Sequence, residues 1–206
     1  MRSLALCLAL TLLTGCDRVR EAIPLFGGAA PEPLPPITAA ELAALPGPLI
    51  RVDLPVTGAS ARLGLAATNG PHRTYISPDQ IGLVLREGTL VATRGFSYDL
   101  MFADNEETRV ALRNGGGSAL VRVHRTLDGE RHEVISSFVC DLRPAGTDTL
   151  AIAGQSVRTQ LLRESCTGPE ANFVNTYWIA PGGTLRKSIE WVGPETGYAE
   201  ITHLRP

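Results

Sequence analysis

From residue 49 onward, hydrophobic and polar positions alternate with a period of two. The clearest case is residues 61–68, where Ala61, Leu63, Leu65 and Ala67 share one face. Such alternation is typical of strands that bury one side. Further runs follow as far as 198–204, separated by turn residues such as Pro181-Gly182-Gly183. The pattern therefore predicts a chain of short strands.

Turn-forming residues support this interpretation. The 21 glycines and 15 prolines are spread along the chain, which favours many turns over long helices. We expect an all-β fold, an antiparallel meander of about ten strands curled or closed into a barrel- or sandwich-like single domain over residues 49–206. Residues 97–102 are expected to form a helical turn, and 114–117 a flexible break.

One hairpin is predicted in detail. Asp128-Gly129 has the composition of a two-residue type I′ turn and lies between the predicted strands 120–127 and 130–141. Counting back from this turn pairs His124 with Glu133 and Arg125 with His132. A separate strand is expected at 149–153.

The N-terminus has a different pattern. One arginine, an apolar run over residues 4–13 and Leu13-Thr14-Gly15-Cys16 form a secretory signal peptide. The last four residues resemble a bacterial lipobox, which implies cleavage after residue 15 and attachment of acyl chains such as palmitate to Cys16. The alternative is a plain secreted protein whose signal ends beside a cysteine.

A tether is expected between this lipid and the β domain. Residues 16–48 are rich in proline and glycine, a composition that favours extended chain. Thr38 and Glu41 have the spacing of a capping box, which predicts a short helix over residues 39–45. Pro46-Gly47-Pro48 would end it.

Composition excludes some functions. The formal net charge is −2, from 19 Lys and Arg against 21 Asp and Glu, and no basic block is present, so we expect no nucleic acid. Cys140 and Cys166 form an even pair in an oxidising compartment, which predicts a disulfide. Two free thiols are the alternative. Neither cysteine has a CxxC partner, so no redox or zinc site is expected.

No catalytic motif is recognisable. The histidines do not have metal-ligand spacing, and we expect no cofactor and no metal; they are His72, His124, His132 and His203. A surface or half-buried histidine on a strand is the expectation for each. The acidic group Asp99, Asp104, Glu106 and Glu107 is interpreted as a solvated loop rather than a cation site. A pair of carboxylates gathered by the fold would still permit a glycan hydrolase.

Aromatic residues gather in the last three predicted strands. They are Phe173, Tyr177, Trp178, Trp191 and Tyr198. Tyrosine and tryptophan rings are amphipathic platforms on which a sugar can lie. We predict contact with a glycan or a partner through Tyr177, Trp178, Trp191 and Tyr198; the alternative is that these rings fill the core.

The same region resembles a known family. Asn175-Thr176-Tyr177-Trp178, Gly183, the run 186–194 and the final Leu204-Arg205-Pro206 are similar to the YjbF/GfcB family, lipoproteins of exopolysaccharide and group 4 capsule operons. Residues 90–96, followed by Asp99-Leu100, also resemble it. Glu190 stands where the family pattern has glutamine.

The resemblance implies an all-β, periplasm-facing lipoprotein that assists export or assembly of a surface polysaccharide without catalysis. It implies polysaccharide export proteins and surface glycan as partners, beside the membrane that holds the lipid. The alternatives are a glycan-active enzyme of the envelope and a structural envelope lipoprotein without glycan contact. The family favours the outer membrane, whereas Asp17 after the lipidated cysteine resembles an inner-membrane retention signal.

Overall fold

The computed structural model describes residues 34–206. The predicted signal peptide and Cys16 lie outside these residues. The two described helices are α2 (Ala39–Ala44) and α3 (Glu106–Asn114). The strands are β1 (Leu49–Leu54), β2 (Ala59–Asn69), β3 (His72–Ile76), β4 (Gly82–Arg86), β5 (Thr89–Arg94), β6 (Phe102–Asp104), β7 (Gly117–Leu127), β8 (Glu133–Ile152), β9 (Gln155–Thr167), β10 (Asn172–Ile179), β11 (Leu185–Gly193) and β12 (Gly197–Arg205).

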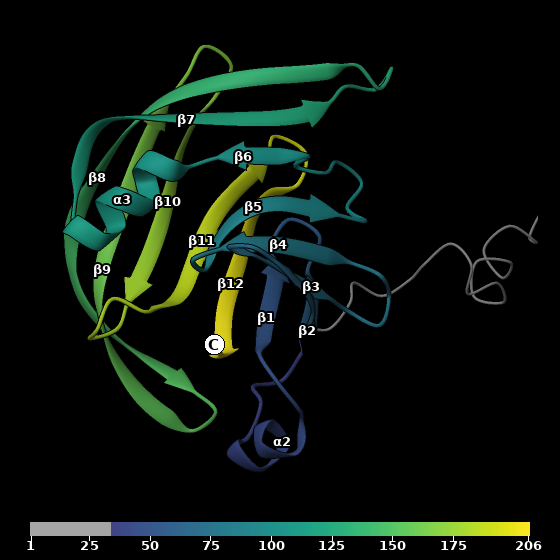
Figure 1. Ribbon diagram of the computed structural model, residues 1–206, viewed down its shortest axis with the longest axis vertical. Helices are drawn as coiled ribbons and strands as arrows, with labels where there is room; N and C mark the ends of the chain where they lie inside the picture. The colour runs from purple at the N-terminus through teal and green to yellow at the C-terminus, as the bar shows by residue number, and fades with distance from the viewer. Residues whose placement is uncertain (1–33) are drawn as a thin grey trace, which may run out of the picture.

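All twelve strands form one antiparallel sheet. Its order is β5-β4-β3-β2-β1-β12-β11-β10-β9-β8-β7-β6, so strands that are neighbours in sequence pair with each other, except that β1 pairs with β12 and that β5 and β6 form the two edges. The sheet curls until β5 and β6, which are joined by residues 95–101, face each other (Figure 1). The result is a nearly closed barrel-shaped sheet, as the alternating pattern predicts.

The two halves of the sheet are joined at its middle. In the β1–β12 ladder, Ile50 lies opposite His203 and Asp53 opposite Glu200. An apolar core fills the half made by β1–β5 and β12 and reaches Val192 near the end of β11. Its buried members are Ile50, Val52, Leu63, Tyr75, Leu83, Leu85, Leu90, Leu100, Ala103, Val192, Ala199 and Ile201. These are the inward positions of the alternating runs.

The predicted capping box is present. The Thr38 side chain accepts from the Glu41 backbone N–H, and the Glu41 carboxylate accepts from the Thr38 N–H at 2.7 Å. This helix ends at Ala44, one residue before the predicted end. None of its own residues is buried, but Ile37 beside it packs with Leu49 and Leu204. Among residues 34–206, neither helix has the length and apolar composition needed to cross a membrane.

The position of α3 differs from two expectations made from the sequence. Residues 97–102 form no helix, and the helix begins instead at Glu106, within the group interpreted as a solvated acidic loop. Glycine at the left-handed position after the last turn (Gly115, φ 77°) ends it. Figure 1 shows α3 in front of the strands at the open side of the sheet. Its Ala111 packs against Leu142 and Leu162 of β8 and β9.

The detailed hairpin register is wrong. His124 lies opposite Ser136 and Arg125 opposite Ile135, because the connection between β7 and β8 spans residues 128–132 rather than two residues. The Asp128 carboxylate accepts backbone bonds from Glu130 and His132, which stabilises this longer turn. The separate strand at 149–153 is also wrong: β8 runs unbroken to Ile152, with a register shift between Pro144 and Gly146.

Candidate functional site

A charged group lies at the centre of the other half of the barrel. Arg122 points inward from β7, Glu164 from β9 and Glu190 from β11, and the three side chains have no exposed surface. Arg122 Nη1 lies 3.1 Å from Glu164 Oε2, and Nη2 lies 3.5 Å from Glu190 Oε2. One guanidinium therefore joins two carboxylates from three strands. We call these three residues the Arg122 cluster.

Neutral donors complete the hydrogen bonds of both carboxylates. Glu164 accepts from Tyr177 Oη at 2.9 Å, from Asn175 Nδ2 at 2.7 Å and from the Thr108 hydroxyl of α3. Glu190 accepts from the Ser188 hydroxyl at 2.9 Å. Buried charges persist only when they are paired and bonded in this way. The arrangement is therefore one that stabilises ions inside the sheet.

Glu190 of the cluster, together with Asn105, also bonds the open edge of β5. The Leu90 N–H donates to Glu190 Oε1 at 2.9 Å, and the Leu90 carbonyl accepts from Asn105 Nδ2 at 3.0 Å. Glu107 Oε2 likewise accepts from the Val121 N–H at 2.6 Å, beyond the end of β6. Side chains here take the place of the missing strand partner, which satisfies the edge backbone.

Burial and neighbouring charge shift the titration of the interior. Burial raises the pKa of Glu190, an effect that the Arg122 guanidinium opposes. Burial lowers the pKa of Arg122, but the Glu164 and Glu190 carboxylates more than reverse this and raise it above its ordinary value. Burial also raises the pKa of Tyr177 well above its ordinary value. Arg122 thus stays cationic, and Tyr177 remains a neutral donor.

His124 links this interior to a pocket at the end of the barrel. Arg122 Nε donates to His124 Nε2 at 2.9 Å, and the ring lies 5.5 Å from both Phe138 and Trp191. Burial, and then the Arg122 charge, lower the pKa of His124 well below its ordinary value. The ring is therefore neutral. It forms part of the wall of a pocket with a volume of about 350 Å³, which we call the His124 pocket.

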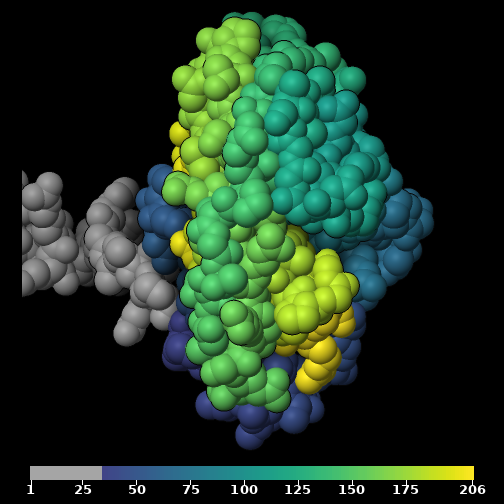
Figure 2. All heavy atoms as spheres, turned by 90° about the vertical axis from the view of Figure 1, so that its left-hand side faces the viewer, coloured from purple at the N-terminus to yellow at the C-terminus, as the bar shows by residue number. Residues whose placement is uncertain are grey.

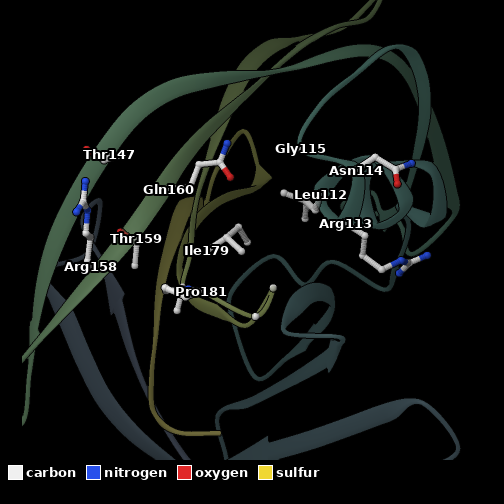
Figure 3. Close-up of a pocket in the computed structure, with 13 residues that line it drawn as sticks. Leu112, Arg113, Asn114, Gly115, Thr147, Arg158, Thr159, Gln160, Ile179 and Pro181 are labelled. Carbon is white, nitrogen blue, oxygen red and sulfur yellow. The ribbon is translucent and has the colours of Figure 1, made fainter.

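A second pocket lies between α3, the β8–β9 hairpin and the turn after β10. Figure 3 shows Leu112 and Asn114 on one side, Gln160 and Arg158 on the other and Ile179 between them. Its volume is about 670 Å³. The surface is hollowed where the green β8–β9 region meets the yellow-green turn and the teal helix (Figure 2). No aromatic side chain is among the residues that line this α3 pocket.

The four aromatic residues predicted to contact glycan have different environments. Tyr177 has no exposed surface, so the expectation that its ring would meet a glycan is corrected: the ring packs in the core and its hydroxyl serves Glu164. Trp178 is 8% exposed, and its Nε1–H donates to Asp148 at 2.8 Å. Trp191 and Tyr198 are half-buried.

Trp191 and Tyr198 lie where β10 and β11 separate. The ladder between these strands ends at Thr176 and Ile189. Beyond it, the Trp191 N–H donates to Asn175 Oδ1 at 2.8 Å, and the Val174 N–H donates to the Tyr198 hydroxyl at 3.2 Å. Trp191 lines the His124 pocket, and its contact with glycan remains a prediction.

The predicted disulfide is present between Cys140 and Cys166, which lie opposite each other on β8 and β9. Among residues 34–206, the one group of side chains close enough to share a metal ion contains these two cysteines and Glu164. Because both sulfurs are bonded to each other, this group has no thiolate to offer.

The other histidines and acidic residues lie apart. His124 and His203 are buried, whereas His132 is exposed beside Asp128. His72 is half-buried at the start of β3. The acidic group is divided among separate bonds: Asp99 accepts from Thr93, Glu106 pairs with Arg86, and Glu107 binds the β7 backbone.

Sequence reasoning missed the Arg122 cluster. Its one visible signal is the run 120–125, in which Arg122 and His124 alternate with two valines. The alternation shows that Arg122 and His124 share one face of the strand, but it does not show which face is buried. In the structure the charged residues point inward, and Val121 is 50% exposed.

Comparison with known proteins agrees with this fold. The family model described as group 4 capsule polysaccharide lipoprotein gfcB, YjbF matches residues 24–204. The uncharacterized lipoprotein YjbF of Escherichia coli K12 is 25% identical over 146 residues, which cover 64% of this chain and 63% of that protein. The chain thus spans less than two thirds of that relative's length.

The crystal structure of the hypothetical lipoprotein YmcC from Escherichia coli K12 has a similar fold. It superposes with a TM-score of 0.71 at 25% identity, and the match covers 81% of this chain and 88% of YmcC. The strand order, the relatives and the length of the family match lead to one conclusion. The chain belongs to the group 4 capsule polysaccharide lipoprotein family.

Proposed function

We propose that this protein is a lipid-anchored, periplasm-facing envelope lipoprotein that assists export or assembly of a surface polysaccharide and does not catalyse a reaction on it. The observation that carries the proposal is the family match over residues 24–204. Acyl chains on Cys16 hold the domain at a membrane, and surface glycan and polysaccharide export proteins are its partners. The outer membrane is preferred, with the inner membrane as the alternative because of Asp17.

The interior geometry supports a non-catalytic role. A hydrolase of the usual kind needs two carboxyl groups that reach the scissile bond. Inside the barrel the fold brings together the carboxylates of Glu164 and Glu190, but both are fully buried and bonded to Arg122. Their bonds tie β7, β9, β11 and the edge of β5 together. We therefore assign them to the stability of the sheet.

The test is secreted polysaccharide per cell in a deletion strain. The strain is complemented with the wild type, with Cys16→Ser or with Cys7→Ala, a matched loss of a cysteine from the predicted signal peptide. We expect the wild type and Cys7→Ala to restore secretion and Cys16→Ser to fail. Normal secretion in the deletion strain would contradict the proposal. Separation of the two membranes then shows which one carries the wild-type protein.

A further inference from the structure

The His124 pocket contains an unpaired donor in its wall. His124 is 1% exposed, and its Nδ1 has no hydrogen-bond partner among residues 34–206. Because Nε2 accepts from Arg122, the proton of the neutral ring resides on Nδ1. Buried donors in native proteins are nearly always paired, so this N–H indicates that an oxygen acceptor is accommodated here. The Nδ1 atom itself is buried, so a ligand oxygen reaches it only if the pocket wall moves.

The same pocket has an aromatic side. Trp191 lies against Phe173 with ring centroids 4.6 Å apart and planes inclined by 12°. Phe138 meets Trp191 edge-on at 5.7 Å. These contacts fix the indole in place, while its half-buried side lines the pocket. A rigid, partly exposed indole is a suitable platform for the C–H face of a sugar ring.

The charged side chains that line the pocket are acidic. Asp99, Asp128, Glu170 and Glu195 line it, and none of the lining residues in the described part of the chain is a lysine or an arginine. A backbone bond from His132 is the main reason that the pKa of Asp128 is lowered, so this carboxyl is anionic at neutral pH. Ser136 donates to one oxygen of Glu170 at 2.7 Å. Such a rim repels uronic acids and phosphates and attracts amines and hydroxyl donors.

We propose that the His124 pocket binds a sugar unit that carries no acidic group, either uncharged or bearing an amine. The unit stacks on Trp191, offers an oxygen to His124 Nδ1–H and places its amine or hydroxyls near Glu170 and Glu195. A volume of about 350 Å³ lies in the range of small-molecule sites. This inference rests on the proposed function and adds the chemical class of the glycan.

The first test is titration of the full lipidated chain in detergent. In a Trp178→Phe background, Trp191 is the one remaining tryptophan, so its fluorescence reports on the pocket. The probes are trisaccharides of glucosamine, N-acetylglucosamine and galacturonic acid. We expect saturable changes with the first two and none with the third. Galacturonate binding as tight as the others, or no response to any of the three, would overturn the proposal.

Charge variants sharpen the test. Glu195→Gln with Glu170→Gln should weaken glucosamine binding by about threefold or more and leave N-acetylglucosamine binding unchanged. The matched control is Asp79→Asn, which removes one charge from the β3–β4 connection, outside the pocket. Equal weakening by the control would contradict a local effect of the rim. Binding of a lysine-rich peptide without any binding of sugars would instead identify a protein partner and overturn the proposal.

A nitrogen NMR measurement covers the case in which a variant does not fold. In the wild type, the ¹⁵N shifts of His124 should show a proton on Nδ1, and saturating glucosamine trisaccharide should move the Nδ1 signal. An unmoved signal under saturation would contradict the assigned contact. These measurements are independent of secretion, so normal secretion in the deletion strain would refute the proposed function and leave sugar binding to be judged separately.

Discussion

The two halves of the barrel are stabilised in opposite ways. In the half formed by β1–β5 and β12, the buried side chains are mostly apolar and pack as a hydrocarbon core, with His203 of β12 as a buried polar exception. In the half formed by β7–β11, inward positions include an arginine between two glutamates, and the valines of β7 face outward. The same alternation of residue types thus builds two different interiors. What decides the inward face is the set of partners across the barrel, not polarity alone.

This difference has an energetic consequence. Removal of an apolar side chain costs its burial and the cavity that remains. Removal of one member of a buried ion cluster leaves the others without compensation, which costs more. We therefore expect the polar half to be the more sensitive to single changes.

The largest effect is expected for Arg122→Met. It leaves Glu164 and Glu190 buried without a counter-charge, so the free energy of unfolding should fall by about 3–5 kcal/mol, measured by urea denaturation. The matched control is Arg125→Met on the same strand, where an exposed pair with Glu133 predicts a loss of about 0–1 kcal/mol. Adding Glu164→Gln and Glu190→Gln to Arg122→Met should recover most of the loss. Equal losses for Arg122→Met and Arg125→Met would contradict the expectation that the buried cluster stabilises the protein more than an exposed ion pair does.

Leu63→Ala tests the apolar half. Leu63 has no exposed surface in the core of β1–β5, and its truncation should lower the free energy of unfolding by about 3 kcal/mol. Leu54→Ala, at a partly buried position of β1, should cost clearly less. A larger loss for Leu63→Ala than for Arg122→Met would reverse the ranking of the two halves.

Acid should weaken the protein through His203. Burial lowers the pKa of His203 from an ordinary 6.5 to about 4. Between pH 6.5 and 4, His203 therefore binds a proton in the unfolded chain but not in the folded one. The stabilising contribution is complete above pH 6.5 and is lost as the pH falls toward 4. That loss is about 3 kcal/mol.

The check for this effect is the pH dependence of unfolding in His203→Gln, which should have a shallower slope between pH 6.5 and 4 than the wild type. His132→Gln, at a side chain that is 69% exposed, serves as the control and should keep the wild-type slope. An unchanged slope in His203→Gln would show that other groups cause the acid sensitivity.

Thr108→Val is the mildest change of the four. It removes the hydroxyl donor to Glu164 Oε1, whereas Arg122, Asn175 and Tyr177 remain bonded to Oε2 of the same carboxylate. We expect a loss of about 1 kcal/mol in the free energy of unfolding, measured by urea denaturation. A loss as large as that of Arg122→Met would mean that the donors, rather than the counter-charge, stabilise the cluster.

Strand alternation and turn residues were sufficient to predict much of the sheet. Residues 49–54 and 172–179 were predicted with the bounds observed. α3 was missed because its acidic first turn was interpreted as a solvated loop, although Gly115 stands where a helix of that length would end. The β7–β8 register failed because Asp128 supports a turn longer than two residues.

The candidate site was less predictable. Strand spacing shows that Arg122 and His124 share a face, but only the closed sheet shows that Glu164 and Glu190 lie across from them. Trp191 was selected from composition, whereas the pocket beside it is formed by residues from four separate stretches of the chain. Such groups depend on the closure of the sheet, which no local pattern contains.

The central claim is that the Arg122 cluster stabilises the sheet and has no chemical role in the proposed export of polysaccharide. The most direct measurement is secreted polysaccharide per molecule of folded lipoprotein in the deletion strain complemented with Glu164→Gln, which is nearly isosteric. The account predicts secretion in proportion to the amount of lipoprotein. Wild-type amounts of folded Glu164→Gln protein with secretion abolished would contradict it.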